Sequence, residues 1–374
     1  MGLDKRIRIL VIVNAIFGYD GISNVAVNYY HYQNKSKVQM DLLTINDIPD
    51  YLKREIEDDG NRHFVVTERN RNPIGYIVKI KDIVSRNKYD IVYIHGNSAT
   101  MAIDLLGAKL GGCKVRVAHS HNTQCDHQKI NNVLMPVFSK LYTDCCACSI
   151  EAGQFLFKSK ECYVVNNGIS PSKYEFSNNI RERIRKKYGL DGKFVIGHIG
   201  RFSYQKNQEF LLPLLRELLN RGQDAMLLLV GNGETIEKIK GLAYEWNLVK
   251  HVVFYGTTDH INEVLQAMDC FVFPSRFEGL GIVAIEAQAA GLKCVISEEV
   301  PKTVDVMKNS RFISLQQPLS RWADLVIEQR NSADERQNNV ERTRERIKEA
   351  GFDIEENCKD MLNYYMRILK VKRL

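Results

Sequence analysis

Residues 270–297, CFVFPSRFEGLGIVAIEAQAAGLKCVIS, combine two carboxylates with a glycine-rich turn. Glu278 lies in the turn, and Glu286 follows eight positions later on the helix that the alanine-rich run predicts. The first turn of a helix leaves backbone N–H groups without partners at the positive end of the helix dipole, which favours an anion. Carboxylates repel phosphate but accept hydrogen bonds from hydroxyl groups. The pattern therefore indicates a ligand with both phosphates and hydroxyls, as in a nucleotide sugar.

A glycine, an arginine and a lysine follow the apolar run Phe194–Ile199. Gly200 and Arg201 come directly after this predicted strand, and Lys206 stands five residues beyond Arg201, where a helix is expected to begin. Arginine offers a planar fork of donors and lysine a compact point charge, so together they can neutralise a diphosphate. An ordinary pair of surface cations is the alternative interpretation.

Two weaker signals follow the next two predicted strands. Gly231 and Gly233 stand in LLLVGNGE and would line the same crevice, although a single Gly-x-Gly is also ordinary turn chemistry. Tyr255 and Gly256 end the following strand, where backbone groups could hold the edge of a base. A core aromatic residue followed by a turn explains this second pair equally well.

The N-terminal half offers a loop glycine and two histidines. Gly21 permits close approach of the backbone to an anion, although a plain turn has the same composition. His119 and His121 follow the strand predicted at Lys114–Ala118. We expect the two rings to point to opposite sides of the extended chain, so that only one reaches the ligand. His121, further out of the strand, is the better candidate, and a structural or surface histidine is the alternative.

Short apolar runs alternate with helical patterns along the whole chain. Such strands are typical of parallel sheets covered on both faces, so we predict an α/β fold with two doubly wound domains, residues 1–170 and 171–353. The ligand of such a pair is expected in the cleft between them, at the carboxyl ends of the strands. The expected strands are Ile7–Val13, Val38–Leu43, His63–Val66, Ile91–Ile94, Lys114–Ala118, Cys145–Cys148, Cys162–Val165, Phe194–Ile199, Ala225–Val230, His251–Tyr255, Cys270–Phe273, Lys293–Ile296 and Phe312–Ser314.

The charge of the chain is spread rather than concentrated. The 374 residues carry a net charge of +7, with 21 Lys+Arg against 17 Asp+Glu in residues 1–170 and 31 against 28 in the remainder. Proteins that bind nucleic acid usually show a concentrated basic face, so we expect no nucleic-acid partner. No apolar stretch approaches the ~20 residues needed to span a bilayer, and the short apolar run near the N-terminus is interpreted as the first strand rather than a signal peptide.

The nine cysteines lie mostly in apolar runs and are interpreted as small core residues in a reducing compartment. Cys145, Cys146 and Cys148 form the only cluster. No second pair and no histidine at zinc-finger spacing accompanies them, so we expect no metal site.

These elements, in this order, resemble the retaining glycosyltransferases of family 4, which have the GT-B fold. The resemblance covers nearly the whole chain, and it implies two Rossmann-like domains facing a central cleft, with a C-terminal helix, about 354–374, that crosses back to the first domain. The sequence departs from the family where Asp20-Gly21 replaces paired glycines and where Ser170 replaces a frequent aspartate. The motifs that carry the resemblance are Asn167-Gly168-Ile169, Gly200-Arg201 with Lys206, Gly231-Asn232-Gly233, and the E-x7-E element of Glu278 and Glu286.

The resemblance also implies a role for each of these residues. Arg201 and Lys206 would hold the donor diphosphate, and the amides of Gly279, Leu280 and Gly281 would cradle phosphate and sugar. In the same donor site, Glu278 would accept hydrogen bonds from the sugar and Glu286 from the ribose. In the first domain, the loop at Gly21 would approach the phosphates, and His121 or His119 would contact the transferred sugar near the reacting carbon.

The diphosphate leaving group would be neutralised by cations and helix N-termini, and the sequence has no Asp-x-Asp triplet of the kind that holds a cation in metal-dependent transferases. We therefore expect a metal-independent hexosyltransferase without a cofactor.

The expected reaction is transfer of a sugar from a nucleotide sugar, most simply a UDP-hexose, to a lipid-linked saccharide in the biosynthesis of a capsule or exopolysaccharide. Retention would follow from same-face attack, with the departing phosphate taking the proton of the acceptor. We expect a cytoplasmic enzyme in peripheral contact with the inner membrane face. The alternatives are a nucleotide-sugar epimerase of the same fold and a non-catalytic nucleotide-sugar-binding protein.

Overall fold

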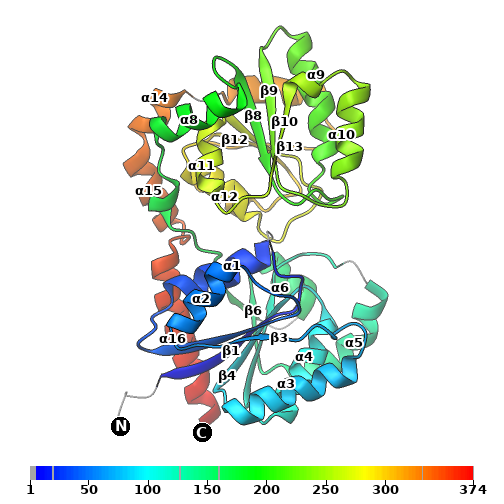
Figure 1. Ribbon diagram of the computed structural model, residues 1–374, viewed down its shortest axis with the longest axis vertical. Helices are drawn as coiled ribbons and strands as arrows, with labels where there is room; N and C mark the ends of the chain where they lie inside the picture. Colours follow the sequence, from blue (N-terminus) through cyan, green and yellow to red (C-terminus); the bar gives the residue numbers. More distant parts are fainter. Residues whose placement is uncertain (1–5, 19–20, 126–127, 159–160, 331, 374) are drawn as a thin grey trace. The chain divides into compact units, whose positions relative to one another are not determined.

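The computed structural model describes residues 6–18, 21–125, 128–158, 161–330 and 332–373 (Figure 1). The chain forms two compact units, each described by itself below. Unit 1 contains residues 1–168 and 354–374, and unit 2 contains residues 169–353. Within the described residues, no helix combines the length and the apolar composition that a membrane crossing requires.

The described part of unit 1 contains one sheet with the strand order β3-β2-β1-β4-β5-β6-β7, in which every neighbouring pair is parallel. The strands are β1 (Ile7–Val13), β2 (Val38–Thr44), β3 (His63–Val65), β4 (Ile91–Gly96), β5 (Val115–Ser120), β6 (Asp144–Ala147) and β7 (Tyr163–Val164). The helices are α1 (Gly21–Tyr32), α2 (Asp50–Asp58), α3 (Pro73–Asn87), α4 (Ala102–Leu110), α5 (Gln128–Leu141), α6 (Ile150–Phe157) and α16 (Ile354–Arg373).

Helices cover both faces of this sheet. Alternate side chains of a strand point to opposite faces, so Ile9 and Val11 of β1 join one core cluster and Leu10 and Ile12 join the other. The first cluster includes residues of α1, α2 and α16, and the second includes residues of α3, α4, α5 and α6. β1 is apolar on both faces, and this pattern is the reason that we predicted a parallel sheet covered on both faces.

The described part of unit 2 contains a second parallel sheet, with the order β10-β9-β8-β11-β12-β13. Its strands are β8 (Phe194–Ile199), β9 (Ala225–Val230), β10 (Val252–Gly256), β11 (Cys270–Phe273), β12 (Cys294–Ser297) and β13 (Arg311–Ile313). Its helices are α7 (Pro171–Tyr174), α8 (Asn178–Tyr188), α9 (Leu211–Asn220), α10 (Ile236–Glu245), α11 (Ile261–Val264), α12 (Ile282–Ala289), α13 (Leu319–Glu328), α14 (Ala333–Asn338) and α15 (Val340–Glu349).

The C-terminal helix α16 packs against unit 1, as the resemblance implied. Its buried residues Ile354, Cys358, Met361, Tyr365 and Ile368 are spaced three or four positions apart, so they form one stripe along the helix. This stripe joins the core cluster of β1, α1 and α2.

Two strands of unit 1 run two residues further than predicted. We expected strands ending at Ile94 and Ala118, whereas β4 continues to Gly96 and β5 to Ser120. The two strands pair in register through His95 with His119. Backbone hydrogen bonding continues regardless of side-chain polarity, and the polar histidines therefore belong to the sheet.

One pair of cysteines differs from the expectation of reduced core residues. Cys145 in β6 and Cys162, directly before β7, form a disulfide with their Cα atoms 5.0 Å apart. Six of the seven other cysteines are buried and form no disulfide, in agreement with the core interpretation, and Cys125 is only partly buried.

Candidate active site

Glu278 lies in the turn that joins β11 to α12. Gly279, Leu280 and Gly281 complete the turn and are buried. Gly281 caps α12 with φ at +90°, and a Cβ there would lie 2.9 Å from the ring of Phe273, so both the conformation and the space require glycine. The turn therefore brings the carboxylate to the N-terminus of α12, where backbone N–H groups favour an anion.

Lys206 meets Glu278 in this turn. Its Nζ lies 2.7 Å from Oε1 of Glu278, and Gln205 donates from Nε2 to Oε2 at 3.2 Å. The side chains of Lys206 and Glu278 are only 18% and 6% exposed, so water screens this pair weakly. The ammonium also lies 5.0 Å from the ring centroid of Phe273. The structure thus brings one predicted cation and one predicted carboxylate into direct contact.

Arg201 occupies a different environment. Its side chain is 64% exposed, and Nε donates to Oε2 of Glu234 at 3.1 Å. It is a surface cation in this conformation, whereas Lys206 is partly buried.

Glu286 lies on α12 and is almost fully buried. Its Oε1 accepts a hydrogen bond of 2.7 Å from the hydroxyl of Tyr174, a residue of α7 that the sequence did not single out. Burial raises the pKa of Glu286, while the Tyr174 hydrogen bond and the charges of Lys173 and Lys206 act against that shift. Lys206 therefore influences both acids of the E-x7-E element.

Glycines at or directly after the ends of β8, β9 and β10 let the backbone segments there approach one another closely. Gly231 has φ at +131°, and a Cβ there would lie 2.2 Å from the carbonyl oxygen of Gly200. Gly233 has φ at +157°, and its Cβ would lie 2.3 Å from the carbonyl oxygen of Phe202. The Gly231 N–H also donates to the Gly256 carbonyl at 2.9 Å. The Gly-x-Gly motif thus permits close backbone packing at the carboxyl edge of the sheet.

Tyr255 is the one aromatic candidate in this group. Its ring lies 5.0 Å, centroid to centroid, from that of Tyr188 in α8, and burial raises its pKa. The Tyr255 side chain therefore packs against α8, which agrees with the alternative interpretation of a structural aromatic residue.

His198 is a buried group near this site that the sequence reasoning did not select. It lies in β8, its Nδ1 is 2.9 Å from the carbonyl oxygen of Val272, and its Nε2 has no partner among the described residues. Burial lowers its pKa to about 4, so the ring is neutral. Its position inside an apolar strand concealed it, because nothing in the strand pattern distinguishes it from a core residue.

The candidate loop of unit 1 is described only in part. Gly21 is the first residue of α1, and a Cβ there would meet no atom within 4 Å, whereas Asp20 lies outside the described residues. The Gly18 N–H donates to Oγ of Ser23 at 3.1 Å.

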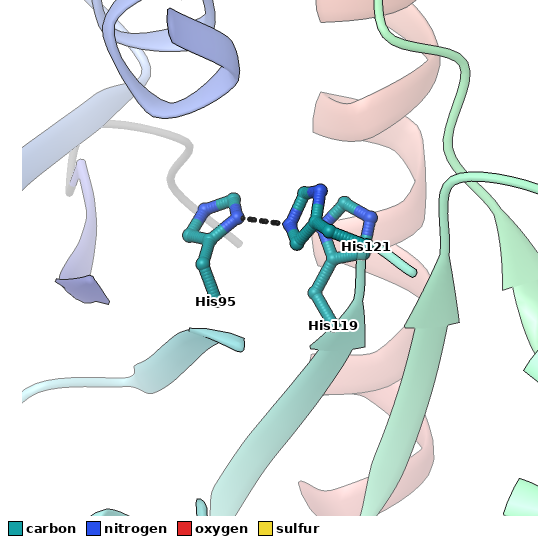
Figure 2. Close-up of side chains that lie close together, drawn as sticks. All are labelled: His95, His119 and His121. Carbon is teal, nitrogen blue, oxygen red and sulfur yellow. Dashed lines mark hydrogen bonds between the residues drawn. The ribbon is translucent and has the colours of Figure 1, made fainter. Parts of the chain in front are cut away.

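The two predicted histidines belong to a cluster of three at the ends of β4 and β5 (Figure 2). His95 Nδ1 lies 2.8 Å from His121 Nε2, and His119 Nδ1 lies 2.9 Å from the hydroxyl of Tyr93. His119 is completely buried, while His121 is only partly buried. His121 is therefore the ring that remains accessible. His95 was missed because its strand was expected to end at Ile94.

The expectation that His119 and His121 point to opposite sides is wrong. Their ring centroids lie 3.9 Å apart, one ring over the other (Figure 2). Residues two positions apart in an extended chain point to the same face of the sheet.

The three histidines each offer a ring nitrogen within 4.8 Å of the others. Two imidazoles on one tetrahedral zinc ion hold their nitrogens about 3.3 Å apart and direct both lone pairs at the ion. Here the His95 and His121 nitrogens are 2.8 Å apart, which is a hydrogen-bond distance, and the rings of His119 and His121 are tilted by 34° to one another. In this structure, a hydrogen bond joins two of the three rings.

Comparison with known proteins shows the family of this chain. Residues 180–346 match the model of the glycosyl transferases group 1, and the chain is 33% identical over 360 residues to the putative glycosyltransferase EpsF of Bacillus subtilis, covering 92% of this chain and 93% of that protein. The chain belongs to the group 1 glycosyltransferases. This confirms the family that the E-x7-E element and its companion motifs indicated.

One further relative supports this assignment of the glycosyltransferase, and one solved structure shows its fold. It is 27% identical over 301 residues to the UDP-Gal:alpha-D-GlcNAc-diphosphoundecaprenol alpha-1,3-galactosyltransferase of Escherichia coli, covering 74% of this chain and 76% of that one. The crystal structure of Anabaena HepE in complex with UDP and glucose superimposes with a TM-score of 0.78 at 16% identity, covering 95% and 98% of the two chains. This similarity confirms the predicted GT-B fold.

Proposed function

We propose that this glycosyltransferase moves a hexose from a UDP-hexose to a lipid-linked saccharide, with retention of configuration and without a metal ion, during assembly of a cell-surface polysaccharide. The observation that carries the proposal is the largely shielded Lys206–Glu278 pair at the N-terminus of α12.

The donor fits this pair in chemical terms. The ammonium of Lys206 and the backbone N–H groups at the start of α12 supply positive potential where a diphosphate gains charge as it leaves. Glu278, held by Lys206 and Gln205, can accept hydrogen bonds from sugar hydroxyls. Glu286, supported by Tyr174, can accept from the ribose. A UDP-sugar is supported by the name of the Escherichia coli relative and by the UDP bound to HepE.

Retention follows in this proposal from attack on the same face as the departing diphosphate. Glu278 is the carboxylate nearest to the donor sugar in our assignment, and both of its oxygens already interact with donors. It therefore serves as a hydrogen-bond acceptor rather than a covalent nucleophile, and the leaving phosphate takes the proton of the acceptor hydroxyl. In this proposal, the positive charges of Lys206 and Arg201 neutralise the leaving diphosphate, as a metal ion would otherwise do.

A lipid-linked acceptor calls for a surface that meets the cytoplasmic face of a membrane. Helix α5 buries Phe138 and Leu141 but presents Ile130, Val133 and Val137 to solvent, with exposed fractions of 50%, 76% and 50%. These three residues share one stripe at helical spacing, and residues 128–140 include two lysines and no acid. An apolar stripe beside positive charge suits an anionic lipid surface.

The decisive experiment is a transfer assay with UDP-hexoses and a polyprenyl-diphosphate saccharide, followed by NMR of the anomeric configuration of the product. Transfer with a retained α linkage is expected, and chelation is expected to leave the rate unchanged. The variants Glu278→Ala and Arg201→Ala are expected to abolish transfer while keeping a native thermal unfolding profile. Full turnover in either variant would disprove the site, consumption of the donor without acceptor would indicate an epimerase, and UDP binding without turnover would indicate a non-catalytic binding protein.

A further inference from the structure

His95 is buried at the end of β4, with 4% of its surface exposed. Its ring reaches across to the loop after β5, where Nδ1 lies 2.8 Å from Nε2 of His121 (Figure 2). The two ring planes are inclined by only 28°. His121 is thus held at a defined ring nitrogen by a residue that is itself fixed in the sheet.

A hydrogen bond between two neutral imidazoles requires a proton on one nitrogen and a lone pair on the other. Whichever ring donates, the bond determines whether Nε2 of His121 carries the proton or the lone pair. The other nitrogen, Nδ1, then has the opposite character, because a neutral imidazole carries one N–H and one lone pair. The bond between His95 and His121 therefore determines what Nδ1 of His121 can offer to a ligand.

The surroundings of His95 keep the cluster neutral. Three phenols and one imidazole line the small cavity that His95 shares: Tyr29 from α1, Tyr93 from β4, His119 from β5 and Tyr365 from α16. Burial raises the pKa of all three phenols and lowers the pKa of His95 to about 3. No carboxylate or cation lines this cavity in the described part of the chain.

We propose that His95 is a positioning residue that orients the ring of His121 and sets which of its nitrogens carries the proton. This role rests on the proposed function, in which His121 contacts the transferred sugar. His95 itself touches no substrate in this scheme and acts only through the 2.8 Å bond.

Three substitutions separate this role from simple packing. His95→Asn keeps an amide near the position of Nδ1, His95→Gln has similar bulk but carries its amide near the position of Nε2, and His95→Ala removes both. We expect kcat to fall about 10- to 100-fold in the alanine and glutamine variants with little change in the KM for the donor, because a misplaced reacting group costs rate. The asparagine variant is expected to recover most of the loss. His260→Ala, an exposed histidine of unit 2, serves as the control.

The pH profile of kcat provides a second readout, beside the rates of the three variants. Burial and the neighbouring His95 lower the pKa of His121, so its neutral form persists below its ordinary range. In His95→Ala, water reaches the ring and its pKa returns toward about 6.5, so kcat is expected to acquire a new acid limb. A folded alanine variant with wild-type kcat and pH profile would overturn the proposal, as would equal loss in the asparagine and glutamine variants.

Ring ¹⁵N NMR of the histidines decides the matter independently of turnover. His121 is expected to show one neutral tautomer in the wild-type protein and in His95→Asn, and an averaged, titrating signal in His95→Ala. An unchanged tautomer in the alanine variant would overturn the positioning role. If no donor is turned over by the wild-type protein, the proposed function fails, while the NMR result still tests the bond between His95 and His121.

Discussion

The ammonium of Lys206 lies 2.7 Å from the carboxylate of Glu278, although 72 positions separate the two residues in the chain. The contact joins the loop after β8 to the turn before α12, because β8 and β11 are neighbours in the sheet of unit 2. The carboxyl ends of neighbouring parallel strands lie at one edge, so groups that follow them converge.

The first prediction concerns Lys206→Ala. Loss of the ammonium removes charge stabilisation of the leaving diphosphate and leaves Glu278 buried without its ion-pair partner. We expect kcat to fall about 10²- to 10³-fold, as for the loss of one transition-state donor. Lys238→Ala, which removes an exposed ammonium paired with Glu209, is expected to leave the rate unchanged. Steady-state kinetics with thermal unfolding of both variants provides the check, and a Lys206 variant that keeps a tenth of the activity contradicts the role.

The second prediction concerns Tyr174→Phe, which removes the hydroxyl that donates to Glu286. We expect UDP affinity to weaken about 3- to 10-fold, because a buried carboxylate loses a hydrogen bond. Tyr244→Phe, at an exposed tyrosine, is the matched control.

We also expect UDP binding to depend on pH, and the Tyr174→Phe variant tests this dependence. Burial raises the pKa of Glu286, so the ionised form that accepts from ribose is lost at a higher pH than for an exposed glutamate. UDP binding is therefore expected to weaken as the pH falls toward this raised pKa. Because the Tyr174 hydroxyl lowers the pKa, its removal should move the weakening to higher pH. Calorimetric titration of UDP across the acid range tests the shift, and superimposable curves for the two proteins count against it.

The third prediction concerns the glycine that packs against the Gly200 carbonyl. Gly231→Ala is expected to lower the free energy of unfolding by at least about 2 kcal/mol, because φ at +131° and a 2.2 Å approach leave no room for a Cβ. Gly241→Ala, in the open interior of α10, is expected to stabilise the protein by about 0.5–1 kcal/mol instead. Urea unfolding distinguishes the two, and equal stability of both variants refutes the packing argument.

The fourth prediction concerns the apolar stripe of α5. Val133→Asp places a carboxylate at the most exposed position of the stripe, so co-sedimentation with phosphatidylglycerol vesicles is expected to decrease severalfold. Val249→Asp makes the same change at an exposed site of unit 2 and should have no effect. Equal vesicle binding of the two variants and the wild-type protein would exclude this surface as the membrane contact.

Much of the fold could be predicted from local pattern. Buried parallel strands are apolar on both faces, and the run Ile7–Val13 was therefore recognisable as β1 without any knowledge of its partners. The turn of Glu278 was recognisable from its glycines. Position 281 has a positive φ, which few residues other than glycine adopt. Chemistry that lies inside strands was not recognisable in the same way, as His95 and His198 show.

The sequence alone determined the alternation of strands and helices and the presence of two acids beside a phosphate-type turn, because these depend on residue types close together in the chain. The tertiary structure decided which distant side chains meet. It paired Lys206 with Glu278, gave Glu286 the hydroxyl of Tyr174, left Arg201 at the surface and joined His95 to His121. These contacts depend on strand order and register, which backbone hydrogen bonding sets across the sheet and which no local pattern specifies.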